Sequence, residues 1–310
     1  MDTQLSLRRL EIFRLVVEER SVTRAAEVLM VAQPAVSNQL RALEMWLGAK
    51  LFERNGNRLV LTEAGERTDR WARDVLAGAA QIRRDVSDLA TGLGGSVIIW
   101  ASMAVGTYLL PKVLTDLRQA RPRADLTLHI AQPGEALQAV ESGDADFAVV
   151  SWDQRHLPES VEAEFLRSEP LILYMTPTAA PPSRSMPISA AMSLPLVGAP
   201  RNAVYRDLVE RLRMTTHLDP NFIIRFGHVE AIKRAAIAND WALFAPAYAM
   251  QPEVDAGCLV AVDVPELVIH ERLVLFSRQD HLFSPLQQAA VDAVRAVLAA
   301  DMLPVDPARR

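Results

Sequence analysis

Cysteine is almost absent from this sequence, since Cys258 is the one cysteine in 310 residues. A single thiol cannot form an internal disulfide, and it excludes a paired-thiol redox sensor and a zinc finger. A chain of this length buries most of its apolar surface, so it can fold without a disulfide or a metal ion. Half of the residues are hydrophobic and 23% are charged, which is typical of a globular protein and argues against disorder.

Long apolar runs and a signal sequence are also lacking. No stretch approaches the roughly 18 uncharged apolar residues of a membrane-spanning helix. Residues 1–13 lack the basic start, the apolar core and the small-residue cleavage site of a signal peptide. We therefore expect a cytoplasmic protein that does not associate with a membrane.

The motifs of common enzymes do not occur either. There is no Gly-x-Ser-x-Gly elbow, no P-loop and no dinucleotide-binding glycine fingerprint. The histidines are scattered and none pairs at metal-ligand spacing on a helix. Asp144 and Asp146 lie at a helix-to-strand turn, where carboxylates are usually solvated. We expect no catalytic site, no metal and no cofactor.

The net charge of −5 is unevenly distributed. Residues 1–62 hold nine Lys or Arg and seven Asp or Glu, a net charge of +2, so residues 63–310 carry −7. A slightly basic head on an acidic body fits a nucleic-acid binder, although small domains often differ by a few charges.

The head has the pattern of three helices followed by a hairpin. Apolar spacing, a serine N-cap and a proline in the first turn predict helices over 6–19, 21–29 and 33–46. Strands are predicted on either side of Asn55-Gly56-Asn57, a strong hairpin signal. This order describes a winged helix-turn-helix over residues 1–62.

The third predicted helix has the composition of a helix that reads DNA. Its apolar residues Val36, Leu40 and Leu43 share one face, which leaves small and hydrogen-bonding residues and Arg41 on the other. Such a face suits the major groove, where base edges offer donors and acceptors. An ordinary solvated face is the alternative, but the preceding short helix and the following hairpin favour DNA binding.

A long helix over 63–90, capped by Thr62, follows the head. Its apolar residues form a heptad seam, namely Trp71, Val75, Ala79, Ile82, Val86 and Leu89. Packing within its own domain is one reading, but we favour pairing between chains because both neighbouring domains are complete without it. The glycine-rich residues 91–95 are the best domain boundary in the chain.

From Ser96 onward strands alternate with helices, which predicts an α/β body with largely parallel sheets. The predicted strands are 97–100, 126–130, 147–150, 171–175, 196–198, 222–226, 242–245, 259–262 and 272–276, and the predicted helices lie near 106–120, 134–142, 203–214, 228–238 and 285–300. The body, 91–310, is long for one sheet. Two lobes with a cleft between them are expected, lobe I over about 91–166 and 268–302 and lobe II over about 167–267.

Six sequence blocks resemble the LysR-type transcriptional regulators. They are Ser21-Val22-Thr23-Arg24-Ala25-Ala26, Gln33-Pro34-Ala35-Val36-Ser37-Asn38-Gln39-Leu40, Leu43-Glu44, Leu47-Gly48, Leu51-Phe52-Glu53-Arg54 and Leu61-Thr62-Glu63-Ala64-Gly65. The resemblance covers the whole chain and implies a linker helix and a two-lobed effector domain similar to type 2 periplasmic binding proteins. It also implies a homodimer or homotetramer that binds interrupted inverted repeats in promoter DNA, responds to a small-molecule effector and contacts RNA polymerase.

The helix-turn-helix motif of the family maps to Val22–Arg41, and Arg54 and Arg58 flank the hairpin tip, where a wing usually meets phosphates. For either arginine alone, a solvated surface residue is an equal alternative. The candidate DNA-binding residues are Thr23, Arg24, Gln33, Pro34, Ser37, Asn38, Arg41, Arg54 and Arg58.

The body resembles, more loosely, the branch of the family that contains the Calvin-cycle gene regulators, through Ala101-Ser102, Gly106–Pro111 and Glu230–Lys233. In the family, the serine equivalent to Ser102 commonly contacts the effector. The position between a strand and a helix gives it free donors, although a helix cap without a ligand is the alternative. The candidate effector-binding residues are Ser102, Met103, Gln132, Trp152, Arg201, Asn202 and His228, and we expect a small anion.

The sequence departs from the family pattern at three places that bear on the effector. Ala104 stands where relatives often have threonine, Gln132-Pro133 replaces an Asn-Thr pair, and Asn239-Asp240-Trp241 replaces a glycine-rich turn. Two other functions stay open. One is a cytoplasmic small-molecule-binding protein or enzyme with a vestigial head, and the other is an architectural DNA binder, against which the large α/β body argues.

Overall fold

The computed structural model describes residues 5–55, 58–91, 94–152, 157–200, 210, 213–214, 217–267, 269–279 and 281–300. The chain divides into two compact units: unit 1 holds the chain up to residue 92 together with 138–145, and unit 2 holds 93–137 and 146–310. Among the described residues, no helix combines the length and the apolar character that a membrane crossing requires.

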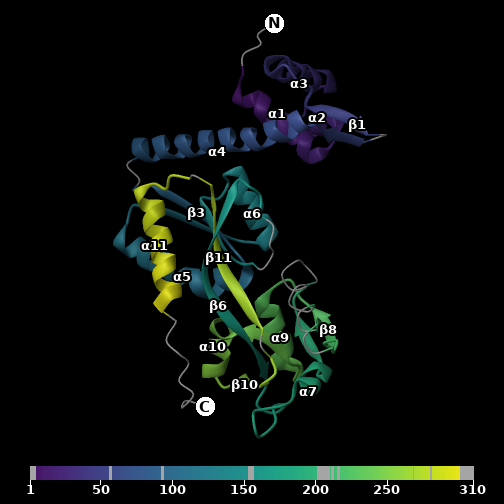
Figure 1. Ribbon diagram of the computed structural model, residues 1–310. Helices are drawn as coiled ribbons and strands as arrows, with labels where there is room; N and C mark the ends of the chain where they lie inside the picture. Colours follow the sequence, from purple (N-terminus) through teal and green to yellow (C-terminus); the bar gives the residue numbers. More distant parts are fainter. Residues whose placement is uncertain are drawn as a thin grey trace. The chain divides into compact units, whose positions relative to one another are not determined.

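Unit 1 begins with the predicted three helices and hairpin (Figure 1). Its elements are α1 (Leu7–Glu19), α2 (Val22–Val28), α3 (Gln33–Leu47), β1 (Phe52–Asn55), β2 (Arg58–Leu61) and α4 (Glu63–Thr91). Leu10, Phe13, Val36 and Leu43 are fully buried at the centre of this head. Helical spacing of apolar residues therefore predicted the core correctly, because each helix contributes one apolar face to it.

The ends of these helices follow their capping residues. The side chains of Ser6 and Ser21 accept hydrogen bonds from backbone amides three residues later, and α3 ends at Gly48 with a φ of 70°. Thr62 caps α4 by accepting from the Gly65 amide at 3.0 Å. Gly65 itself must be a glycine, because a Cβ there would lie 2.1 Å from the Leu51 carbonyl oxygen.

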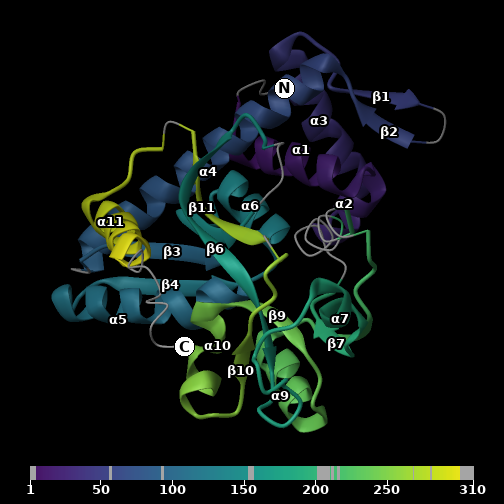
Figure 2. The same ribbon diagram turned by 60° about the horizontal axis from the view of Figure 1, so that its bottom comes forward.

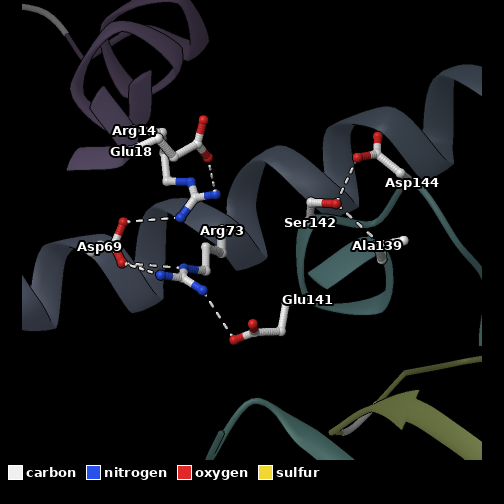
Figure 3. A network of polar contacts seen from close by, with 8 residues as sticks. All are labelled: Arg14, Glu18, Asp69, Arg73, Ala139, Glu141, Ser142 and Asp144. Carbon is white, nitrogen blue, oxygen red and sulfur yellow. Dashed lines mark hydrogen bonds and ion pairs between the residues drawn. The ribbon is translucent and has the colours of Figure 1, made fainter. Parts of the chain in front are cut away.

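A polar network joins α4 to α1 (Figure 3). The Asp69 side chain is 8% exposed and pairs with both Arg14 and Arg73. Arg73 also pairs at 3.0 Å with Glu141, in the 138–145 segment of unit 1. The Arg14–Asp69 pair links the second turn of α4 to α1, because breaking it would remove one of the two cations that compensate a buried carboxylate.

Unit 2 is built on a seven-stranded mixed sheet with the order β10-β6-β11-β5-β3-β4, and β9 also pairs with β6. Its strands are β3 (Ser96–Ala101), β4 (Asp125–Ile130), β5 (Phe147–Ser151), β6 (Val161–Met175), β9 (Leu243–Pro246), β10 (Val260–Val262) and β11 (His270–Arg278), and β7 (Leu196–Gly198) and β8 (Phe222–Arg225) form a separate pair. Only β3–β4, β3–β5 and β7–β8 among the described strand pairs are parallel. The prediction of largely parallel sheets is therefore wrong.

The helices of unit 2 are η1 (Val105–Leu109, a π-helix), α5 (Leu110–Ala120), α7 (Ile188–Ser193), α9 (Val229–Asn239), α10 (Ala247–Asp255) and α11 (Pro285–Ala300). A further helix, α6 (Pro133–Ser142), begins in unit 2 and ends in the 138–145 segment of unit 1. One core packs α5 and α11 against β3, β5 and β11, and we call this part lobe I. Two further clusters pack α7, α9 and α10 around β9, β10 and the end of β6, and we call this part lobe II. Paired β6 and β11 connect the lobes (Figures 1 and 2).

Three elements were missed or cut short by the sequence pattern. The first ten residues of β6 alternate with charged side chains such as Glu162 and Glu164, so they show no apolar run. α10 contains Pro252, which normally argues against a helix, and α7 is only six residues long. The helix predicted near 203–214 falls mostly outside the described residues.

Asp146 also differs from its prediction. It is fully buried, and its side chain accepts a hydrogen bond from the Ile98 amide at 2.8 Å. The expectation of a solvated turn carboxylate is therefore wrong for Asp146, which is a structural link between β5 and β3.

Candidate functional site

The first candidate surface is the outer face of α3 in unit 1. Val36, Leu40 and Leu43 are 0%, 8% and 0% exposed, so they face the core. Pro34, Asn38 and Arg41 are exposed and Ser37 is half-buried. The Gln33 amide donates to the Ser37 hydroxyl at 2.9 Å. This face presents hydrogen-bonding groups on a rigid helix, which is what base-edge recognition requires.

The flanking elements place further polar residues on unit 1. Thr23 and Arg24 are exposed on α2, and Arg54 is exposed on β1. Arg24 has a distant ion pair with Glu19, at 3.8 Å. Arg58 begins β2, but its side chain lies outside the described part of the chain. Exposed cations on either side of a helix face can bind phosphates and so position the helix on a duplex.

The second candidate site is a cavity of about 140 Å³ in unit 2. Residues of both lobes line it, and most are apolar: Met103, Ala104, Pro133, Leu171, Ala199, Val229, Ile232, Leu243, Phe244, Ala245, Pro246, Ala249 and Met250. Its polar lining residues are Ser102, Gln132, Ser151, His270, Glu271 and Arg272. An apolar cavity with a few convergent polar groups is the usual form of a small-molecule site.

Ser102 lies on the cavity wall directly after β3, but its donors are not all free. Its backbone amide donates to the Val149 carbonyl at 3.1 Å, and its hydroxyl oxygen accepts from the Ser151 amide at 3.2 Å. The expectation of free donors at Ser102 is therefore wrong for its backbone amide. The hydroxyl hydrogen can still be donated to a ligand, because accepting one bond leaves the donor intact.

Glu271, on β11, is the acidic residue of this wall. Tyr248 donates to its carboxylate at 2.7 Å. Burial raises the pKa of Glu271 to about 7, although hydrogen bonds from Tyr248 and Ser151 act in the opposite direction. The carboxyl can therefore change its charge near neutral pH.

The other sequence candidates lie in different places. Met103 and Gln132 line the cavity. Trp152 does not, because its indole packs edge-on against Phe276 with ring centroids 5.2 Å apart. His228 does not line it either, since its ring caps α9 by accepting from the Glu230 amide. Arg201 and Asn202 lie outside the described residues.

Some lining residues were not predicted. Ser151 ends the parallel strand β5, and the carboxyl ends of parallel strands are a common place for ligands, so this position could have been found. Glu271 and the wall formed by β9 carry no such signal. Glu271 lies near Ser151 because β11 pairs antiparallel with β5, and β9 joins the wall through the packing of lobe II. Among the described residues, no group of His, Cys, Asp and Glu could hold a metal ion.

Comparison with protein families covers both units. The model of the lysR family of bacterial regulatory helix-turn-helix proteins matches residues 7–66, and the model of the LysR substrate binding domain matches residues 90–299. The chain belongs to the LysR family. It is a DNA-binding transcriptional regulator with an effector-binding domain, and its family is one of transcriptional regulators.

Relatives support this assignment along the whole regulator. A "Probable RuBisCO transcriptional regulator" of Trieres chinensis is 29% identical over 290 residues, which cover 90% of this chain and 93% of the relative. A protein of the same name from Trichormus variabilis is 29% identical over 294 residues, covering 93% and 87%.

Solved structures show the same fold as the regulator. ArgP from Mycobacterium tuberculosis has a TM-score of 0.64 at 21% identity, covering 96% of this chain and 98% of ArgP. The LysR-family regulator CbnR has a TM-score of 0.59 at 20% identity, covering 95% and 99%.

Asp240 is one of the residues that depart from the family pattern, and it lies in the turn after α9. Asp240 ends α9 with a φ of 55°, a left-handed conformation that usually favours glycine. Its carboxylate accepts hydrogen bonds from Thr176 and Thr178, and these bonds lower its pKa. The two hydroxyls stabilise the ionised aspartate at this turn.

Proposed function

We propose that this regulator recognises promoter DNA through the head and that a small molecule in the cavity of unit 2 controls the binding. The proposed bounds are 1–62 for the winged head, 63–90 for the linker helix and 91–310 for the effector domain, with lobe I over about 91–166 and 268–302 and lobe II over about 167–267. The cavity carries this proposal, because residues of both lobes line it and a ligand there would favour one arrangement of the lobes.

On the DNA side, the exposed α3 residues would enter the major groove. Asn38 and Arg41 are suited to adenine and guanine respectively, whose edges match their paired donors and acceptors. Thr23 and Arg24 on α2 and the arginines of the hairpin would bind phosphates. A homodimer or homotetramer would place two heads on an interrupted inverted repeat, one on each half-site.

The cavity sets the size and polarity of the effector. A cavity of about 140 Å³ is close to the roughly 150 Å³ that holds a benzene molecule. The effector is therefore a small molecule with an apolar body and one polar end held by Ser102, Gln132 or Ser151. If that end is anionic, ionised Glu271 opposes it, so the anion binds with Glu271 protonated.

The regulator acts without catalysis and works in the cytoplasm, where its DNA target and RNA polymerase are found. This part of the proposal is supported by the family, whose members are regulators of transcription. The names of the relatives suggest RuBisCO genes as a target to test beside the upstream region of the regulator's own gene.

Two measurements on the full-length chain test the proposal. In a gel shift, the regulator should retard one of these promoter fragments and not a scrambled duplex. In a thermal-shift screen against small metabolites, a compound at 100 times its Kd should stabilise the protein by about 2.7 kcal/mol. If no promoter fragment is retarded while a metabolite stabilises the chain, a small-molecule-binding protein with a vestigial head becomes the better reading.

A further inference from the structure

Tyr108 and Glu230, which lie 122 residues apart in the sequence, meet across the lobes. Tyr108 of η1, in lobe I, donates its hydroxyl to the Glu230 carboxylate of α9, in lobe II. The ammonium group of Lys233, one turn further along α9, lies 4.2 Å from the centre of the Tyr108 ring. The same tyrosine therefore holds two charged residues of the opposite lobe.

Lys233 is almost completely removed from solvent, with 2% of its side chain exposed. Its ammonium group pairs with Glu253 of α10 at 2.7 Å and with Glu230 at 3.3 Å. A buried lysine needs such partners, because an isolated charge in the protein interior is strongly disfavoured. The aromatic face of Tyr108 covers the remaining side of this group.

The hydrogen bond to Tyr108 also changes the acidity of its partners. It is the main reason that the pKa of Glu230 is lowered, and nearby Lys233 lowers it further. Burial, followed by the bond to Glu230, raises the pKa of the Tyr108 hydroxyl far above its usual value. Glu230 is thus an anion and Tyr108 a neutral donor, so the contact between the lobes is a hydrogen bond to a charged acceptor.

This contact borders the cavity. Ala104, one turn before Tyr108, lines the cavity from lobe I, and Val229 and Ile232, which flank Glu230 and Lys233 on α9, line it from lobe II. Separating the lobes would open the cavity, remove the donor from Glu230 and expose the buried side of Lys233 to water.

We propose that Tyr108, Glu230 and Lys233 form an interlobe clasp that holds the effector domain closed around its cavity. This inference deepens the proposed function, because it assigns the closure of the same cavity to named residues. A hydrogen bond to a charged group shifts an equilibrium by roughly tenfold to a hundredfold, so the loss of the Tyr108 hydroxyl should populate an open arrangement.

The test measures the distance between the lobes in the full-length protein without any ligand. Cys258 is exposed in lobe II, and Gln119→Cys at the exposed end of α5 adds a thiol in lobe I. Both carry spin labels, and labelled chains are diluted with unlabelled ones so that only distances within a chain contribute. Tyr108→Phe keeps the ring and removes the hydroxyl, and it should add a population at longer distance.

Two further variants make the result specific. Tyr174→Phe removes a hydroxyl from a buried tyrosine inside lobe II and should leave the distances unchanged. Glu230→Leu removes the acceptor of the Tyr108 hydrogen bond and should reproduce the effect of Tyr108→Phe. Its side chain is 41% exposed, so this variant provides the test if Tyr108→Phe does not fold. Unchanged distances in both clasp variants would overturn the clasp. Such a result would leave the proposed effector site standing, because no ligand enters the measurement.

Discussion

Arg41 projects from the face of α3 opposite the buried Val36 and Leu43. Its exposure and its position one turn after Asn38 make it the arginine on this face that can reach a base. Arg41 could instead contact a phosphate. A base contact depends on the DNA sequence, whereas a phosphate contact does not.

Arg41→Ala should weaken specific DNA binding by about 1–3 kcal/mol and relax the preference at one base pair. Fluorescence anisotropy with the retarded promoter fragment and single-base variants measures both quantities. A uniform loss on every sequence, together with a salt slope lowered by about one, would show a phosphate contact instead. Arg8→Ala, on α1, is a matched control, since Arg8 is exposed and paired with Glu11.

The charge of Glu271 depends on the fold. Burial and the neighbouring Glu169 raise its pKa to about 7 from an ordinary 4.5, against the effects of Tyr248, Ser151 and Arg167. The folded protein thus holds a proton that the unfolded chain releases above pH 4.5. The resulting stability is fully present below that pH and is lost as the pH rises through about 7.

Glu271→Gln should remove this part of the pH dependence. Between about pH 4.5 and 7, the free energy of unfolding of the wild type should fall relative to that of the variant. Glu271 is half-buried between the cavity and the protein interior, so solvent screening reduces this difference to on the order of 2 kcal/mol. Urea unfolding across this range measures it, and parallel curves for the two proteins would contradict the assignment.

At the scale of the element, α4 uses its apolar seam in two ways. Trp71 stacks on Trp46 with ring centroids 6.1 Å apart, and Val75 packs on the core of the head. Further along, Ile82 and Val86 are 60% and 57% exposed. The sequence left packing within the domain and pairing between chains as alternatives. Near its start, α4 packs on its own domain. Further along, its apolar seam is exposed and suited to pairing between chains.

Ile82→Asp should therefore disrupt self-association and, with it, high-affinity binding to an inverted repeat, because it places a charge in the uncovered seam. Analytical ultracentrifugation of the full-length chain measures the change. Arg83→Asp, which alters the charge of the next, exposed residue, is the matched control and should sediment like the wild type. If Ile82→Asp also sediments like the wild type, this part of the helix does not pair between chains.

At the scale of the whole molecule, the effector domain must communicate with the head if the proposed function is right. The cavity and α3 lie in different units, so a change that affects only the ligand should leave DNA binding by itself intact. A variant of Ser102 can separate ligand binding from DNA binding, because Ser102 lines the cavity and does not belong to the head.

Ser102→Ala should preserve promoter binding and blunt the response to the effector. Loss of one hydrogen bond to a charged ligand should cost about 1.5–3 kcal/mol of affinity, and the Ser151 amide also loses its acceptor. Calorimetry with the compound found by the thermal-shift screen measures the affinity. Equal affinities in the variant and the wild type would show that Ser102 serves only the local structure.

The sequence by itself determined the helices of the head, where they begin and end, and the family, because these depend on local signals. Ser6, Ser21 and Gly48 stand where the chain must satisfy helix ends, and apolar spacing assigns each helix its buried face. Family motifs are runs of neighbouring residues, so they can be read without any fold.

The tertiary structure alone decided which distant residues share the cavity and the clasp. Glu271 meets Ser151 and Tyr248 only because β11 pairs antiparallel with β5 and because lobe II places α10 beside it. Tyr108 meets Glu230 and Lys233 because η1 of lobe I and α9 of lobe II, which are far apart in the sequence, lie side by side in the fold. No local pattern encodes these approaches, because they result from the register of long strands and the burial of whole helices, and the charge of Glu271 follows from that burial.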